Sequence, residues 1–340
     1  MKKITINDVA KYAGVSKKTI SRVLNSEPNV SQDTKTKVHH AIKVLGYQPN
    51  PQARALASNQ SLLIGLLYAS QSNSFVSKIQ VGALKRCKND GYNLIIYPED
   101  HESDLLLENL EKGLINTNLD GLILTPPFSD MKPLLSFLET RQIPFVRVGG
   151  DQSLNQHPSV YSNDKEASYE MCRYLISLGH QRIAFIMGHP DHAASKQRLL
   201  GYQQALDEAS IKPIDDYIQQ GFFTFESGEH CARKLLTLSR RPTAIFASND
   251  YMATGIVKVA AQMNLFIPND LTVTGFDNAP ASRYIWPSLT TIKQPITEMA
   301  FEAARILIRI IRQKPIENPN IIFKDELIVR ESSAPAPKLD

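Results

Sequence analysis

The stretch TINDVAKYAGVSKKTISRVLN at residues 5–25 decides the fold of the N-terminal part of the chain. Its first half repeats apolar residues at the spacing of one helix face: Ile6, Val9, Ala10 and Ala13. Gly14 can adopt the left-handed conformation that ends a helix, and Ser16 can cap a second helix from Lys17 to about Asn25. Two short helices joined by a tight glycine turn predict a helix-turn-helix.

The second helix is expected to point polar residues outward: Lys17, Lys18, Ser21 and Arg22. Cations on a recognition helix donate to guanine O6 and N7 in the major groove of DNA. A third helix is expected to begin after Ser31, whose hydroxyl and neighbouring first-turn amides suit a phosphate. The alternative for any one of these charges is a solvated surface, and the motif as a whole favours DNA.

Charge is divided unevenly along the 340 residues. Residues 1–60 contain ten Lys and Arg against three Asp and Glu, a net charge of +7, and the remaining 280 residues therefore have a net charge of −3. A basic head on a mildly acidic body indicates that the head, and not the body, contacts a polyanion.

Length and composition restrict the class of protein. The chain is too long for one typical core, and its longest apolar stretch, residues 62–69, is far shorter than the roughly 20 residues of a membrane-spanning helix. No apolar segment follows Lys2 and Lys3, so no signal peptide is expected and the protein is predicted to be cytoplasmic. Three widely spaced cysteines are expected to be packed core thiols: Cys87, Cys172 and Cys231.

The body alternates apolar runs with amphipathic stretches long enough for helices. The runs lie at residues 62–69, 93–97, 120–125, 143–148, 182–187, 243–248 and 271–276. This alternation predicts α/β architecture, with doubly wound parallel sheets covered by helices. A ligand site is therefore expected beyond the carboxyl ends of these strands.

Several motifs together resemble the lactose-repressor/galactose-repressor (LacI/GalR) family of bacterial transcriptional regulators. In the head these are TINDVAKYAGVS, TISRVLN and GYQPNPQARALA, and in the body VYSND, LGHQRIAFIMG, ASNDYMATG, TGFDN and PSLTTIKQP. The resemblance covers essentially the whole chain. It implies a three-helix DNA-binding head, a hinge helix and a periplasmic-binding-protein-like core of two subdomains.

The resemblance also implies domain boundaries. The head is expected at residues 1–49, the hinge at 50–60 and the core at 61–340, with an N-subdomain of about 61–161 and 294–323 and a C-subdomain of about 162–290 and 326–335. The chain is expected to cross between the subdomains near residues 161–164, 290–294 and 323–326.

In this family the hinge helix folds on operator DNA and inserts a leucine into the minor groove, which implies this role for Leu56. Without the upstream motif, the same segment would be a linker with helical propensity. The residues expected to contact DNA are Thr5, Ser16, Lys17, Lys18, Thr19, Ser21, Arg22, Asn25, Ser31, Asn50, Ala53, Arg54, Leu56 and Ala57.

Position matching implies effector contacts in the core, at Ser72, Asn73, Phe75, Arg198, Asn249, Asp277 and Gln294. Carboxylates, amides and a guanidinium suit the hydroxyls of a polyol, and an aromatic ring covers the apolar face of a sugar. Trp286 either supplies such a ring or packs beside Pro287. Arg147 stands where the lactose-type members carry an acidic residue, and it either lines the cleft or pairs with Asp151 or Asp277.

An enzyme is disfavoured because the chain has no GxSxG elbow, no Walker loop and no dinucleotide-type GxGxxG. His189, Asp191 and His192 lie in one loop without a third cluster, so neither a metal nor another cofactor is expected. A secreted sugar receptor would need a signal peptide and no basic head. The sequence therefore predicts a repressor of carbohydrate-utilisation genes that a sugar releases from its operator, with a corepressor-dependent regulator that binds a purine-like or anionic ligand as the alternative.

A homodimer is expected, because one head reads too short a site and a two-fold pair of heads matches a pseudo-palindromic operator. The last ten residues, ESSAPAPKLD, contain two prolines and no heptad, which excludes the coiled-coil tail of tetrameric members.

Overall fold

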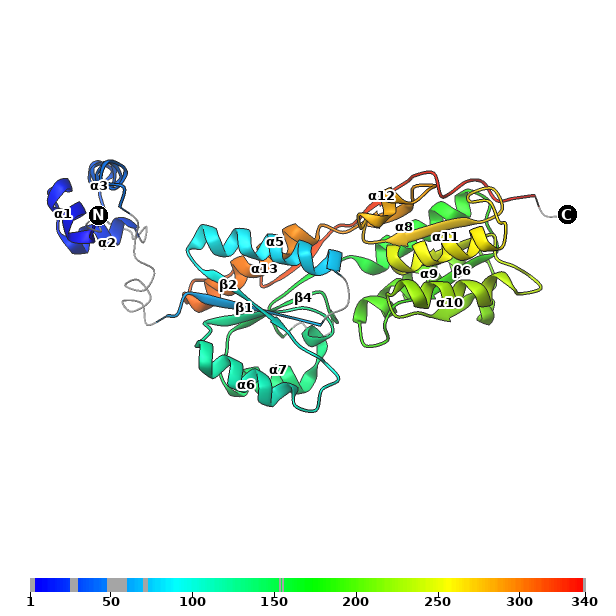
Figure 1. Cartoon of the computed structure of the whole chain (residues 1–340), viewed down its shortest axis with the longest axis horizontal. Coiled ribbons are helices and arrows are strands. Elements are labelled where there is room, and N and C mark those ends of the chain that lie inside the picture. The colour runs from blue at the N-terminus through cyan, green and yellow to red at the C-terminus, as the bar shows by residue number, and fades with distance from the viewer. Residues whose placement is uncertain are drawn as a thin grey trace. The chain divides into compact units, whose positions relative to one another are not determined.

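The computed structural model describes residues 4–24, 30–47, 60–69, 73–152, 154 and 156–338 (Figure 1). The chain divides into two units, Met1–Leu62 and Leu63–Asp340. Among the described residues, no helix is both long and apolar enough to cross a bilayer.

The first unit contains α1 (Ile6–Ala13), α2 (Lys17–Leu24) and α3 (Gln32–Leu45). Their apolar stripes meet in one small core of Val9, Ile20, Val23, Val38 and Ala41. Gly14 ends α1 with a φ of 66°, the left-handed conformation that the turn requires. The predicted helix-turn-helix is confirmed.

The second unit contains two six-stranded sheets. In the first sheet all strands are parallel, in the order β11 (Asn320–Phe323), β5 (Ser159–Ser162), β4 (Phe145–Val148), β3 (Gly121–Leu124), β1 (Leu63–Tyr68) and β2 (Asn93–Pro98). Its two faces are covered by different helix pairs: α5 (Asn73–Asp90) with α13 (Ile296–Ile311), and α6 (Leu106–Thr117) with α7 (Lys132–Thr140) (Figure 1).

The second sheet has the order β12 (Glu326–Ile328), β10 (Thr290–Lys293), β9 (Thr272–Phe276), β8 (Ala244–Ala247), β6 (Ile183–Met187) and β7 (Ile218–Gln220). All its pairs are parallel except β10 with β12. Two helix pairs cover it: α8 (Asp164–Ser177) with α9 (Ala193–Glu208), and α10 (Phe225–Leu236) with α11 (Asp250–Gln262). Shorter elements are η1 (Phe128–Asp130), η2 (Asp215–Tyr217) and α12 (Ala281–Tyr284).

The predicted two-sheet α/β core is confirmed. The chain passes between the two sheets three times: from β5 into α8, from β10 into α13 and from β11 into β12. Three connections therefore join the two sheets. Each sheet with its covering helices forms one subdomain, called here the first-sheet subdomain and the second-sheet subdomain.

Candidate functional site

A pocket lies between the two subdomains, where the carboxyl ends of strands from both sheets meet. It leaves about 830 Å³ free of protein atoms, adjoining open solvent included. It is lined by Ala69, Phe75, Val76, Thr125, Pro126, Val148, Gly149, Gly150, Ser162, Asp164, His192, Ala194, Arg198, Phe223, Asn249, Asp277, Gln294, Ile296 and Met299.

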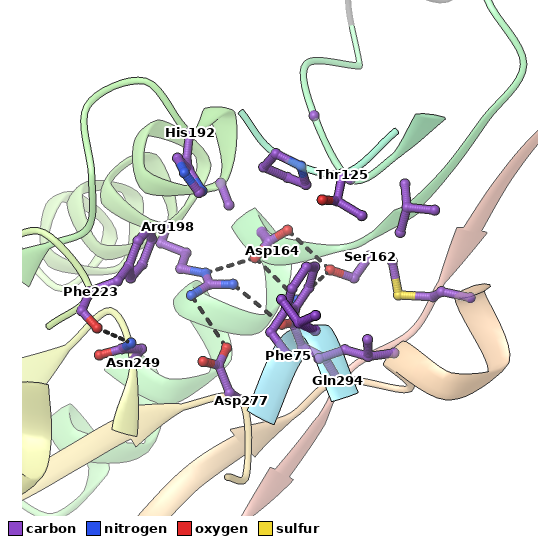
Figure 2. A pocket seen from close by; sticks show the side chains of 18 of the residues that line it. Phe75, Thr125, Ser162, Asp164, His192, Arg198, Phe223, Asn249, Asp277 and Gln294 are labelled. Atoms are coloured by element: carbon purple, nitrogen blue, oxygen red, sulfur yellow. Dashed lines mark hydrogen bonds and ion pairs between the residues drawn. The ribbon is translucent and has the colours of Figure 1, made fainter. Parts of the chain in front are cut away.

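The two walls of this pocket differ in chemistry. The first-sheet subdomain supplies mostly apolar side chains, among them Phe75, Val148 and Met299. The charged lining residues come from the second-sheet side and the connections, and they are Asp164, Arg198 and Asp277 (Figure 2). A ligand with one apolar face and one face rich in hydroxyls fits such an asymmetric pocket.

Arg198 on α9 is the centre of the polar wall. Its Nε donates to Asp164 Oδ1 at 2.7 Å, and an NH1 group donates to the backbone oxygen of Ser248. The guanidinium carbon lies 3.6 Å from the ring centroid of Phe276, a distance that favours cation–π attraction. Only 4% of Arg198 is exposed. These contacts fix the guanidinium in position before any ligand binds.

Gln294 joins Arg198 to the connections between the subdomains. Its Nε2 donates to Ser162 Oγ at 2.6 Å, and its Oε1 accepts from Arg198 NH2 at 3.4 Å. Ser162 Oγ in turn donates to Asp164 Oδ2 at 3.0 Å. The polar wall is therefore built partly on the connections between the subdomains, and a ligand that contacts this wall also contacts those connections.

Asp277 follows β9 in a left-handed conformation with a φ of 98°. Its Oδ1 lies 3.7 Å from Arg198 NH1, longer than a hydrogen bond. Burial raises the pKa of Asp277 to about 6, although Arg198 and Lys78 act to lower it. This carboxylate thus faces the pocket and can accept hydrogen bonds from a ligand.

Asn249 lines the pocket and also begins α11. Its Oδ1 accepts from the backbone N–H of Met252 at 2.9 Å, and its Nδ2 donates to the backbone oxygen of Phe223 at 2.8 Å. These bonds leave one hydrogen and one lone pair of the amide for a ligand. The next residue, Asp250, is fully buried, and burial together with Asp277 raises its pKa well above the usual value.

His192 is the N-cap residue of α9, and the centroid of its ring lies 5.4 Å from that of Phe223. Burial, followed by the nearby His189, His101 and Arg198, lowers the pKa of His192 to about 3. The imidazole is therefore neutral near pH 7 and can both donate and accept a hydrogen bond.

Arg147 requires a correction, because the structure does not place it in the pocket. Its side chain is fully buried, and NH2 donates to Asp130 Oδ1 at 2.6 Å and to the backbone oxygen of Asp151 at 3.1 Å. NH1 donates to the backbone oxygen of Leu154 at 2.9 Å. Arg147 therefore ties η1 to the loop after β4, with a main-chain contact to Asp151 and a partner, Asp130, that the sequence did not indicate.

Trp286 also requires a correction. It is 82% exposed and is absent from the pocket lining, so it does not cover a ligand there. Phe75 and Phe223 are the aromatic rings of the pocket. Phe223 escaped the sequence analysis because it follows the short strand β7, which no apolar run marks.

Five predicted effector residues do come together in the pocket: Phe75, Arg198, Asn249, Asp277 and Gln294. Asn73 begins α5, but its side chain is not among those described. Asp164 and Ser162 were missed, although both belong to the motif VYSND that the sequence analysis quoted.

In the first unit, Lys17 and Lys18 are exposed at the start of α2. Ser16 Oγ accepts from the backbone N–H of Thr19 at 3.1 Å, and Ser31 Oγ accepts from Thr34 at 3.3 Å. At α1, Thr5 donates its N–H and its hydroxyl to Asp8 Oδ2 at 2.8 and 2.7 Å. Ser21 and Arg22 are half-buried on α2. The remaining predicted contacts lie outside the described residues: Asn25, Asn50, Ala53, Arg54, Leu56 and Ala57 in the head and hinge, and Ser72 in the core.

A helix-turn-helix with lysines on its second helix, carried by a two-subdomain core with a pocket at the strand ends, defines a DNA-binding regulator that responds to a small molecule. Comparison with known proteins agrees. Residues 5–50 match the model of bacterial regulatory proteins of the lacI family, and residues 172–333 match a periplasmic binding protein-like domain.

Curated relatives align over nearly their whole length. Catabolite control protein A of Priestia megaterium is 33% identical over 97% of this chain and 99% of its own. The HTH-type transcriptional repressor PurR of Salmonella arizonae is 36% identical over 99% of this chain and 98% of its own.

Solved structures agree with these relatives. The transcriptional regulator CelR in complex with cellobiose has a TM-score of 0.75 at 29% identity, and it covers 97% of this chain and 100% of its own. The Lac repressor dimer bound to operator and the anti-inducer ONPF has a TM-score of 0.74 at 28% identity, and it covers 98% of this chain and 100% of its own. The chain belongs to the lacI family and is a DNA-binding transcriptional regulator.

Proposed function

We propose that this protein is a cytoplasmic, homodimeric repressor that binds a pseudo-palindromic operator and is released from it by a sugar. In this proposal residues 1–49 read the operator, residues 50–60 form the hinge and residues 61–340 bind the effector and the second copy. The protein has no catalytic role in this proposal, in keeping with the relatives PurR and DegA, which are named as regulators of transcription.

The asymmetry of the pocket carries the choice of a sugar. A pyranose presents C–H groups on its faces and hydroxyls around its edge. Phe75 on the apolar wall suits the C–H face, while Asp277, Arg198 and Asn249 offer acceptors and donors to the hydroxyls. Two solved neighbours hold such ligands, CelR with cellobiose and a lacI-family regulator from Enterococcus faecium with ribose, the latter 27% identical with a TM-score of 0.71.

The charge balance of the polar wall also favours a neutral ligand. Asp164 lies within hydrogen-bond distance of Arg198, Asp277 lies near it, and Lys78 lies beside Asp277, so two cations are balanced by two carboxylates. An anionic ligand such as a sugar phosphate would meet a wall without excess positive charge. A purine-like corepressor remains the second candidate, favoured by the two rings of Phe75 and Phe223 on opposite sides of the pocket.

The proposed switch follows from the position of the polar wall on the connections between the two subdomains. A ligand that contacts both walls stabilises one relative placement of the subdomains, by no more than its difference in affinity for the two placements. In a dimer, this change in subdomain placement would alter the distance between the two hinge segments at residues 50–60. The heads would then no longer match the spacing of the operator half-sites.

A thermal-shift screen of neutral mono- and oligosaccharides, sugar phosphates and purines tests the proposal, followed by operator binding with each hit. The expected result is a neutral saccharide that raises the Tm and weakens operator binding at least tenfold. Trp286→Ala is the matched control, because this exposed aromatic lies outside the pocket and its removal should leave the thermal shift unchanged. A purine that raises the Tm and strengthens operator binding would instead establish the corepressor alternative.

A further inference from the structure

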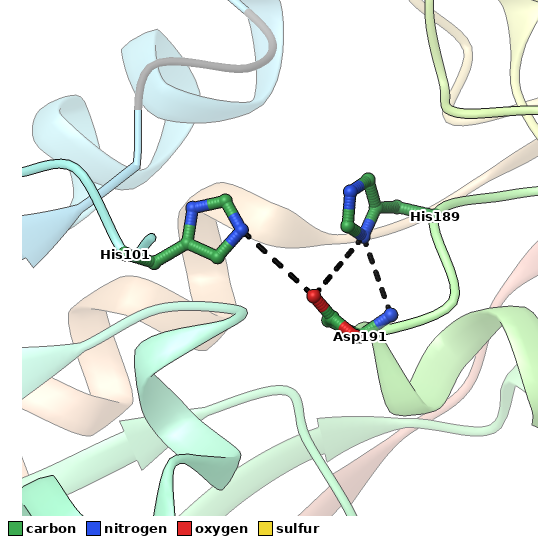
Figure 3. Close-up of side chains that lie close together, drawn as sticks. All are labelled: His101, His189 and Asp191. Atoms are coloured by element: carbon green, nitrogen blue, oxygen red, sulfur yellow. Dashed lines mark hydrogen bonds and ion pairs between the residues drawn. The ribbon is translucent and has the colours of Figure 1, made fainter. Parts of the chain in front are cut away.

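Two histidines and an aspartate from opposite sides of the cleft meet next to the effector pocket. His101 lies in the loop between β2 and α6 of the first-sheet subdomain, while His189 and Asp191 lie in the loop after β6 of the second (Figure 3). We propose that these residues form a binding site for a divalent transition-metal ion of the Zn²⁺ class, which links the two subdomains.

The donor atoms already gather around one point. His101 Nε2 lies 3.9 Å from Asp191 Oδ2, and His189 Nδ1 lies 3.8 Å from the same oxygen. One ligand atom from each residue lies within 4.8 Å of the others. Zinc bonds of about 2.0–2.1 Å in tetrahedral geometry separate ligand atoms by about 3.3 Å, so the gathered atoms need to approach one another by at most about 1.5 Å to complete the site.

His101 supplies the observation that points to a ligand. Its side chain is only 13% exposed, and Nε2 is buried without a hydrogen-bond partner in the part of the chain that the structure describes. A buried polar nitrogen without a partner costs free energy that a metal ion would offset. This nitrogen is directed toward Asp191 across the cleft (Figure 3).

The second-sheet side of the site is held in place by its own backbone. The His189 carbonyl accepts from Ser195 Oγ at 2.6 Å and from the N–H of His192 at 3.2 Å, which ties the loop to the start of α9. His189 Nδ1 accepts from the backbone N–H of Asp191 at 3.2 Å, so this nitrogen carries a lone pair. A metal ion would take that lone pair in place of the long hydrogen bond.

The ligand set indicates the class of ion. Two imidazoles and one carboxylate suit Zn²⁺, Co²⁺ or Ni²⁺, whereas Mg²⁺ and Ca²⁺ prefer oxygen ligands alone. Three protein ligands leave a fourth position for water. His189 and Asp191 do not suggest a metal site in the sequence, because the third ligand, His101, is 88 positions away.

A metal ion at this place would act on the same movement as the effector. Its ligands come from both subdomains, so it would stabilise the arrangement in which they are close together. The ring of His189 lies 5.5 Å from that of His192, a pocket residue, so the ion would lie beside the effector and not in its place.

The experiment is a titration of chelator-treated, tag-free, full-length protein with ZnCl₂ by isothermal calorimetry, without effector or DNA. We expect one ion per chain in the wild type and at least a tenfold weaker affinity in His101→Ala and in Asp191→Asn. The exposed Asp191 side chain makes the second variant safe for folding. His230→Ala, an exposed histidine of α10, is the matched control and should bind as the wild type does.

Small-angle scattering of the same samples tests the link between subdomains. Zn²⁺ should reduce the radius of gyration of the wild type and leave that of His101→Ala unchanged, and MgCl₂ should affect neither. Equal affinity in all four proteins would mean surface binding only and would overturn the proposal, as would loss in Asp191→Asn with full retention in His101→Ala. Neither outcome bears on the sugar, since no sugar is present.

Discussion

The ammonium group of Lys78 lies 3.0 Å from the backbone oxygen of Asp277 and 3.3 Å from that of Asn278. Lys78 belongs to α5 of the first-sheet subdomain, and the two carbonyls belong to the loop after β9 of the second. One half-buried cation therefore joins the two walls of the pocket directly beside the Asp277 carboxylate.

Lys78→Met should weaken effector binding about tenfold, because a hydrogen bond from a charged donor contributes roughly 1.5 kcal/mol and this one holds the two walls of the pocket together. Calorimetric titration with the sugar found in the screen measures the change. Lys88→Met, at an exposed position of the same helix, is the matched control. Unchanged affinity in Lys78→Met would mean that the contact does not contribute to closure.

Effector affinity should depend on pH through Asp277. Burial raises its pKa to about 6, so the carboxylate is charged at pH 7.5 and mostly protonated at pH 5. A ligand hydroxyl that donates to the charged form therefore binds more weakly as the pH falls through 6. Asp277→Asn should lower affinity at least tenfold at pH 7.5 and remove the pH step.

The same shift affects stability with the opposite sign. The native state holds the Asp277 proton more tightly than the unfolded chain, whose ordinary pKa is 3.8. Its contribution to the free energy of unfolding is therefore present below pH 4 and is lost between about pH 4 and 6. The wild-type Tm without effector should reflect this loss across that window, and Asp277→Asn should reduce it.

An effector affinity that stays constant from pH 5 to 7.5 would contradict the role of the Asp277 carboxylate in binding the effector.

Sequence reasoning located the parts of this fold whose chemistry is local. Gly14 predicts the turn and Ser16 predicts the start of the second helix. Both predictions are possible because a left-handed glycine and a capping hydroxyl affect only the backbone within about four positions of them. Strands buried on both faces, such as β8, show as continuous apolar runs. The short strand β7 contains two glutamines and no buried residue, and no such run marks it.

The periodicity of apolar residues cannot predict contacts between segments that are far apart in the sequence. The bond from Arg198 to Asp164 spans 34 positions, and the bond from Gln294 to Ser162 spans 132. Resemblance to a family predicted that Arg198 and Gln294 contact the effector, and both line the pocket. Trp286 was suggested only by its aromatic ring, and it follows the short helix α12, outside the pocket lining. Arg147 lies at a strand end, and only the packing of Asp130 on η1 turns it into a structural residue.

Arg147→Met should destabilise the core by about 3–5 kcal/mol, because it removes the charged partner of the half-buried Asp130 carboxylate and the donor to three backbone carbonyls. Chemical denaturation measures the loss. Effector affinity should stay within a factor of two of the wild type under conditions where the variant is folded. A loss of effector affinity without a loss of stability would contradict this structural role and would mean that Arg147 contacts the effector.

Arg22 on α2 should contribute to reading the operator and not merely to holding phosphates. Replacing Arg22 by Ala should cost about 1–3 kcal/mol on the operator and much less on random DNA of equal length, since a bidentate contact to guanine depends on the base. Lys37→Ala on α3 is the control, because Lys37 is exposed and already pairs with Asp33 at 2.6 Å. Fluorescence anisotropy at two or more salt concentrations separates the cases, because a lost phosphate contact reduces the salt slope by about one unit. Equal losses of affinity for the operator and for random DNA would mean that Arg22 contacts only the phosphate backbone of the DNA.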